Sequence, residues 1–206
     1  MNFWTQTRPF YSICESFRII KSIIFSVNSY CARNKGMLLY VGLILMVAYG
    51  VKLANFYLSI DTERAMVNNS FQGWILQGRY GIYAIRKIFH MSPFVPYASD
   101  VFSVFFLGYA GILWNYLLKK VMRERIGNYK DYIFTGLFIS MPSLAEMMLF
   151  STFNAEVTLG MIFSGICAYC GYRWISGGRH SYAILSVLFL WFLTMDSTMQ
   201  AEFTEN

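Results

Sequence analysis

The chain has 206 residues, of which 56% are hydrophobic, 19% aromatic and only 14% charged, whereas soluble domains carry about 25% charged residues. Too few polar side chains remain to cover a compact globule, and the four cysteines form no pattern typical of a disulfide-bonded secreted domain. The net charge of +6 does not indicate nucleic acid, because the bases lie in short blocks between apolar runs and no nucleic-acid-binding module is present. We therefore predict a protein embedded in the lipid bilayer.

Residues 1–36 predict an amphipathic helix that lies on the inner leaflet. Apolar side chains recur at helical spacing, while charged residues interrupt the segment and no cleavage site of a signal peptide follows. A helix that binds a partner protein is the alternative interpretation. The apolar positions are Phe17, Ile20, Ile23, Ile24 and Val27.

The rest of the chain contains about five apolar stretches, each close to the roughly 20 residues that a transmembrane helix needs. We therefore predict an all-α, polytopic helix bundle that forms a single domain. Lys52 lies near the end of the first stretch, where a long side chain can extend its ammonium group to the interface. The predicted spans are residues 37–60, 97–118, 131–151, 156–174 and 181–200.

The basic residues predict the orientation of the bundle. Twelve of the 17 lysines and arginines lie before the first span, between the second and third, or between the fourth and fifth. The positive-inside rule assigns these segments to the cytoplasm. The N-terminus is then cytoplasmic, and residues 61–96 form a loop on the periplasmic side of a bacterial inner membrane.

With this orientation, carboxylates from separate segments collect near the outer interface. Acids at membrane depth usually face the interior of a bundle or a watery cavity, which favours an acidic crevice that opens outward. Alternatively, these acids extend to the interface, cap a helix N-terminus or pair with Lys52 or Arg64. The acids are Asp61, Glu63, Asp100, Glu146, Glu156 and Asp196.

The outer loop is too long for a simple turn, and loops of this length usually carry function or structure of their own. From Phe71 onward its apolar residues fall on one face of a helix, so we expect an amphipathic helix along the outer interface. Arg79 and Arg86 lie seven residues apart on a neighbouring line and are candidates to bind a phosphate together. Contact with anionic lipid head groups is the alternative.

Asp61, Glu63 and Arg64 begin this loop directly after the first span. A carboxylate here can act as a general base towards a hydroxyl group, or hold a divalent cation that neutralises a phosphate. A solvated helix end shows the same residue types, and composition alone does not separate these interpretations.

The motifs of this loop resemble the first outer loop of the Gtr-type serotype-converting glucosyltransferases, the glucosyltransferase II family of GT-C-like enzymes found in phages, prophages and O-antigen-bearing bacteria. The similarity begins with DTER at residues 61–64 and continues with GWILQGRYG at residues 73–81. The segments MPSLAEMMLF and FNAEVTLG resemble the third and fourth spans of the family. The matching loop residues are Asp61, Glu63, Arg64, Gly73, Trp74, Gln77, Gly78, Arg79, Tyr80 and Gly81.

The resemblance implies transfer of glucose from undecaprenyl-phosphate glucose, a polyprenyl-phosphate donor, to O-antigen sugars of lipopolysaccharide at the periplasmic face. Asp61 and Glu63 would be the catalytic acids or ligands of a divalent cation, and Arg64 and Arg79 would bind the lipid phosphate. Trp74 and Tyr80 would offer aromatic surface to lipid or sugar. The substrate-binding candidates are Arg64, Trp74, Gln77, Arg79, Tyr80, Arg86 and Glu146.

Members of this family are longer than this chain, so we expect the chain to correspond to a truncated N-terminal portion. Two alternative functions follow. One is a non-catalytic accessory or lipid-sugar carrier subunit of the membrane, and the other is an inactive remnant.

Overall fold

The computed structural model describes residues 8–55, 87, 96–122, 129–148, 154–177 and 180–197. All regular elements in these ranges are helices, which confirms the all-α fold class. In chain order they are α1 (Arg8–Arg33), α2 (Lys35–Ala54), α6 (Pro96–Met122), α7 (Tyr129–Ile139), α8 (Pro142–Met147), α9 (Asn154–Ile175) and α10 (His180–Ser197).

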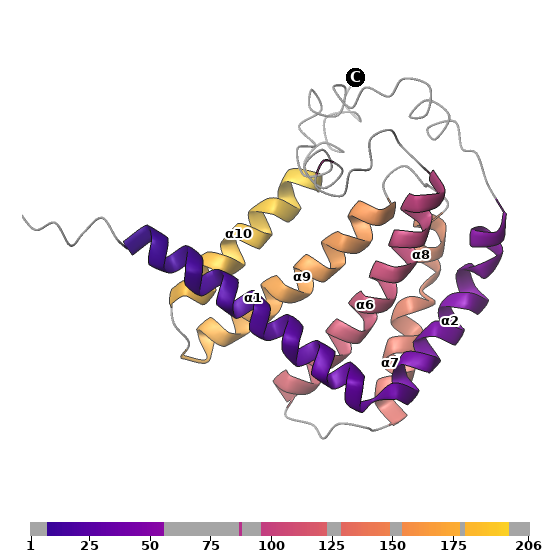
Figure 1. The fold of residues 1–206 in the computed structure, drawn as a ribbon, viewed down its shortest axis with the longest axis horizontal. Helices are drawn as coiled ribbons and strands as arrows, with labels where there is room; N and C mark the ends of the chain where they lie inside the picture. Colours follow the sequence, from indigo (N-terminus) through magenta and orange to yellow (C-terminus); the bar gives the residue numbers. More distant parts are fainter. Residues whose placement is uncertain are drawn as a thin grey trace, which may run out of the picture.

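The helices from α2 onward lie side by side in one bundle, and α1 runs obliquely across it (Figure 1). The order across the bundle is α10, α9, α6, α7 with α8, and α2, in agreement with the packing of each neighbouring pair. At one end α2 stops and α6 and α9 begin, and we call it the Asp100 end. At the opposite end α6 stops and α7 begins, and we call it the Lys119 end.

Helices lie at the segments that hydropathy predicts as spans. Two of them, Lys35–Ala54 and Tyr97–Met122, are long and apolar enough to cross a bilayer. The number of spans otherwise stays a prediction. The predicted helix of the outer loop falls in residues 61–96, which lie outside the described residues except for Lys87 and Pro96.

The third predicted span, residues 131–151, is not one continuous helix. Helix α7 ends at Ile139, and α8 begins at Pro142. Proline has no backbone N–H to donate and disfavours helical backbone at the residue before it, and Met141 accordingly has an extended ψ of 126°. The Tyr49 hydroxyl of α2 donates a hydrogen bond of 2.8 Å to the Ile139 carbonyl oxygen at this break. The break is therefore stabilised by a neighbouring helix.

The core of the bundle is centred on α6, which packs against α2, α7 and α9. Leu107 and Leu113 of α6 are almost completely buried. Glycines permit close approach of the neighbouring helices, as small residues do in membrane bundles. A Cβ atom at Gly108 would lie 2.7 Å from Leu45 Cδ1 of α2, and one at Gly111 would lie 3.1 Å from Ile139 Cγ1 of α7.

The outward face of α2 is apolar and exposed. Val47 is 84% exposed and Met46 is 69% exposed, and Leu39, Leu43 and Val51 continue the same surface. A contiguous apolar surface of this kind is unfavourable in water. It favours contact with lipid.

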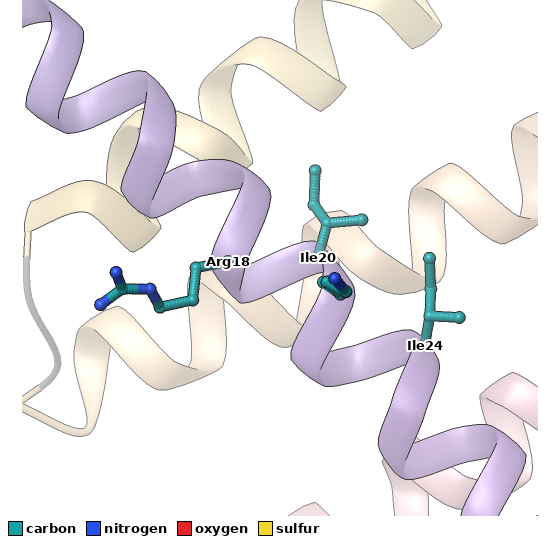
Figure 2. Close-up of a pocket in the computed structure, with 4 residues that line it drawn as sticks. Arg18, Ile20 and Ile24 are labelled. Carbon is teal, nitrogen blue, oxygen red and sulfur yellow. The ribbon is translucent and has the colours of Figure 1, made fainter.

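Helix α1 packs one face on the bundle instead of lying free of it. Ile23 and Val27, which the sequence predicts on the apolar face, are buried, whereas Ile24 is 42% exposed. An open groove of about 570 Å³ runs along the other side, lined by Arg18, Ile20, Lys21 and Ile24. Figure 2 shows Ile20 and Ile24 on the same side of α1 and Arg18 on the opposite side.

A buried polar cluster ties α1 to α6 and α7 at the Lys119 end. Lys119 forms a salt bridge with Asp131, and both side chains are less than 10% exposed. The Lys119 ammonium lies 6.0 Å from the ring centroid of Tyr30, whose hydroxyl accepts a hydrogen bond of 3.3 Å from Asn115 Nδ2. Burial, with the nearby Asp131 carboxylate, raises the pKa of Tyr30 to about 12. The Tyr30 phenol is therefore neutral at physiological pH.

Candidate functional site

Eight of the nine site residues predicted from the sequence lie outside the described residues. These are Asp61, Glu63, Arg64, Trp74, Gln77, Arg79, Tyr80 and Arg86. The ninth, Glu146, is exposed on α8. The other eight residues belong to the segment between α2 and α6. The structure describes both of these helices.

An ion pair joins these two helices. Lys52 Nζ of α2 lies 3.1 Å from Asp100 Oδ1 of α6, and each side chain is only 11% exposed. The Lys52 ammonium therefore points at Asp100, and its extension to the membrane interface stays a prediction. Pairing of Asp100 with Lys52, one of the alternatives for the outer acids, is the arrangement that the structure shows.

Asn154 extends the pair to α9. Its Nδ2 atom donates a hydrogen bond of 3.3 Å to Asp100 Oδ1 and another of 2.8 Å to the Met148 carbonyl oxygen. The Ser103 hydroxyl donates to the Asp100 carbonyl oxygen over 2.7 Å. Asn154 is 2% exposed and Ser103 is completely buried. Three helices and the turn after α8 thus share one polar network.

Glu156 is the third residue of α9 and lies buried inside the bundle. It is 1% exposed and belongs to the first turn of its helix, where the partial positive charge of the helix N-terminus stabilises a carboxylate. Thr158, also completely buried, donates to the Asn154 carbonyl oxygen over 2.9 Å. Sequence reasoning missed Asn154, although a polar residue two positions before Glu156, at the start of an apolar stretch, was the available signal.

We call Lys52, Asp100, Ser103 and Asn154 the Asp100 network. Charges removed from water are costly unless they are paired and hydrogen-bonded, and the network pairs Lys52 with Asp100 and gives Asp100 a hydrogen bond from Asn154. Its geometry joins α2 and α6 at the two attachment points of the outer loop. The network therefore suits a positioning role at the ends of the segment that carries the predicted catalytic residues.

Within the ranges that the structure covers, no group of three or more histidine, cysteine, aspartate or glutamate side chains is arranged to hold a metal ion. Cys167 and Cys170 of α9 are free thiols, and Cys170 is completely buried. The Cys167 sulfur contacts the Ser186 carbonyl oxygen of α10 at 3.3 Å. These two cysteines thus take part in packing of α9. The divalent-cation candidates Asp61 and Glu63 lie outside the described ranges.

The comparisons with known proteins give one family. The family model for the glucosyl transferase GtrII matches residues 50–200, which include the Asp100 network and all nine predicted site residues. No curated protein and no solved structure matches the chain. Because the matched region covers well over half of its length, this chain belongs to the glucosyl transferase GtrII family.

Proposed function

We propose that this protein transfers glucose from a polyprenyl-phosphate donor to O-antigen sugars of lipopolysaccharide, at the periplasmic face of a bacterial inner membrane. The observation that carries the proposal is the family match over residues 50–200. It spans the DTER and GWILQGRYG motifs of the outer loop together with the end of α2 and all of α6.

The outer-loop acids supply the chemistry. The acceptor hydroxyl attacks the anomeric carbon of the glucose, the bond from that carbon to the phosphate oxygen breaks, and polyprenyl phosphate leaves. Asp61 is our candidate for the base that takes the proton of the attacking hydroxyl. Glu63 is its partner, either by orienting Asp61 or by joining it around a divalent cation that neutralises the phosphate. Arg64, Arg79 and Arg86 bind the donor phosphate, because guanidinium groups bind phosphate oxygens through paired hydrogen bonds.

The remaining candidates bind the sugars and the lipid. Trp74 and Tyr80 offer aromatic faces, and Gln77 offers an amide that both donates and accepts hydrogen bonds. Glu146 is exposed on α8, the helix that precedes Asn154 of the Asp100 network. It is therefore available to an acceptor sugar on that side of the bundle.

The Asp100 network supports this arrangement by holding the base of the loop. Lys52 and Asp100 belong to the helices before and after residues 61–96, and their ion pair limits how far the two ends of the loop can separate. Catalytic groups work only within a narrow range of positions. We therefore assign Lys52 and Asp100 as positioning residues.

The direct test is expression in an O-antigen-bearing host that supplies the glucosyl lipid, followed by mass spectrometry of the polysaccharide repeat. The proposal expects one added hexose per repeat with the natural chain and none with Asp61→Asn. The matched control is Glu124→Gln in the basic segment between α6 and α7, which removes an acid outside the proposed site. A repeat without added hexose, in a host where a longer member of the family adds one, contradicts catalysis by this chain.

The same variants test the alternative of a non-catalytic subunit that carries the glucosyl lipid. An enzyme loses hexose transfer on Asp61→Asn while the protein still inserts into the membrane. If Asp61→Asn leaves the hexose content unchanged, the binding function is favoured over catalysis at Asp61.

A further inference from the structure

A second polar site lies where α1 crosses α6, α9 and α10, away from the Asp100 end. It is a small cavity of about 30 Å³, which suits water or the oxygen atoms of one small polar group better than a whole organic molecule. Besides Ile19 and Ile23, its lining consists of hydroxyl groups and one ammonium group. These polar residues are Ser22, Ser26, Tyr116, Lys120, Tyr169 and Tyr182.

Lys120 gives the cavity its charge. Its ammonium lies 3.3 Å from the Tyr116 hydroxyl, 5.5 Å from the Tyr116 ring centroid and 4.9 Å from the Tyr169 ring centroid. Lys119, its neighbour in the chain, is paired with Asp131, whereas Lys120 forms no ion pair with a carboxylate in the part of the chain that the structure describes. An ammonium group has three donors. Two of them serve the hydroxyls of Tyr116 and Tyr169, which leaves one for a ligand.

The surroundings of Lys120 favour an anion. No carboxylate is found among the described residues that line the cavity, and the tyrosine hydroxyls supply hydrogen-bond donors. The Arg173 guanidinium lies 5.7 Å from the ring centroid of Tyr182 and adds positive charge nearby. A cation surrounded by hydroxyl donors matches a group with several negatively charged oxygens, such as a phosphate.

We propose that this cavity binds a phosphate group, with Lys120 as the charge partner and the hydroxyls of Tyr169 and Tyr182 as donors. The phosphate of a phospholipid head group fits best, because α1 and α10 also expose apolar side chains to the outside of the bundle. Phe25 is 75% exposed and Val187 is 64% exposed. The site lies apart from the Asp100 network and does not rest on the proposed glucosyl transfer.

The test is titration of the purified full chain, in a neutral detergent, with water-soluble dihexanoyl phosphatidic acid and separately with inorganic phosphate. Binding is followed by thermophoresis. A hydrogen bond to a charged group contributes about 1.5–3 kcal/mol, so Lys120→Gln should weaken phosphatidic acid binding by roughly tenfold or more. Tyr169→Phe should weaken it several-fold, and Lys120→Arg should retain it.

The matched control is Lys21→Gln, which removes an exposed lysine from the groove lined by Arg18, Ile20 and Ile24. Its affinity should stay at the level of the natural chain. Equal weakening by Lys21→Gln and Lys120→Gln would overturn the proposal, because it indicates general attraction of anions to a basic surface. Failure of both probes to bind the natural chain would also overturn it.

The two probes separate the sources of phosphate. Tighter binding of phosphatidic acid than of inorganic phosphate supports a lipid head group, and equal binding with the same dependence on Lys120 supports a soluble phosphate. Thermal unfolding of Lys120→Gln without any probe controls for a folding defect. If Lys120→Gln unfolds, the other two variants test the proposal. Weaker binding in Tyr169→Phe with retained binding in Lys120→Arg supports it, and unchanged binding in Tyr169→Phe contradicts it.

Discussion

At the scale of single residues, the central feature is the ion pair between Lys52 and Asp100 inside the bundle. Lys52 and Asp100 are each 11% exposed at 3.1 Å from one another. Removal of one partner of a buried pair leaves an uncompensated charge and costs about 3–5 kcal/mol, whereas apolar replacement of both partners is often neutral. Loss of one partner of this pair should therefore lower stability more than apolar replacement of both partners.

We predict that Lys52→Met lowers the stability of the folded chain by about 3–5 kcal/mol. The double variant Lys52→Met with Asp100→Leu should recover most of this loss. Thermal unfolding in detergent, followed by circular dichroism, measures both. A double variant as unstable as the sum of the two single variants would show that the two side chains act independently.

The hydroxyl of Tyr49 gives a second prediction. Its hydrogen bond of 2.8 Å satisfies the Ile139 carbonyl oxygen at the end of α7. Tyr49→Phe leaves this buried carbonyl without its partner and should cost about 1–3 kcal/mol. Tyr129→Phe, at a side chain that is 72% exposed, is the control and should leave the unfolding temperature unchanged.

Tyr30 predicts a pH dependence at the Lys119 end. Its folded-state pKa of about 12 exceeds the ordinary value of 10.0, so the folded chain holds the phenolic proton more tightly than the unfolded chain. The resulting stabilisation is fully present below pH 10 and is lost as the pH rises towards 12. Helix content measured from pH 9 to 12 should fall less steeply in Tyr30→Phe. An identical fall in both proteins would contradict this role.

At the scale of elements, the predicted spans locate the helices because hydropathy measures length and apolar content. The first span, residues 37–60, corresponds to α2, and the second, residues 97–118, to α6. The break at Pro142 was missed because an average over a window does not weigh one missing N–H group. Proline at this position was nevertheless a readable signal for it.

The pairings between elements were less accessible from the sequence. That Asp100 binds Lys52 was one of several alternatives, since spacing along the chain does not decide which helices are neighbours. The hydrogen bond from Asn154 to Asp100 joins residues that are 54 positions apart. Such contacts follow from tertiary packing and not from local pattern.

The glycine of the α2–α6 contact provides a prediction at this scale. A Cβ atom at Gly108 would lie 2.7 Å from Leu45 Cδ1 and 3.3 Å from Val41 Cγ1, so Gly108→Leu should force α2 and α6 apart. Overpacking of this kind costs about 1–3 kcal/mol. Gly42→Leu on α2 meets nothing within 4 Å and serves as the control. Equal unfolding temperatures of the two variants would show that α2 does not pack closely on α6.

At the scale of the whole molecule, the two buried polar clusters lie at opposite ends of one bundle. The Asp100 network lies at the end where α2 stops and α6 begins, and the Lys119–Asp131 pair lies where α6 stops and α7 begins. The Lys119–Asp131 pair lies beside the basic segment between α6 and α7, which the positive-inside rule assigns to the cytoplasm. On this assignment, which stays a prediction, the proposed reaction at the Asp100 end would face the periplasm.

The most direct test of the account is the sidedness of the segment that begins at Asp61. A cysteine-free variant carrying Asn68→Cys is treated in intact spheroplasts with a membrane-impermeant maleimide, and Asn128→Cys in the basic segment is the control for the opposite side. If the segment that begins at Asp61 faces the periplasm, Asn68→Cys is labelled at once and Asn128→Cys only after permeabilisation. Labelling of Asn68→Cys only after permeabilisation would contradict a periplasmic site.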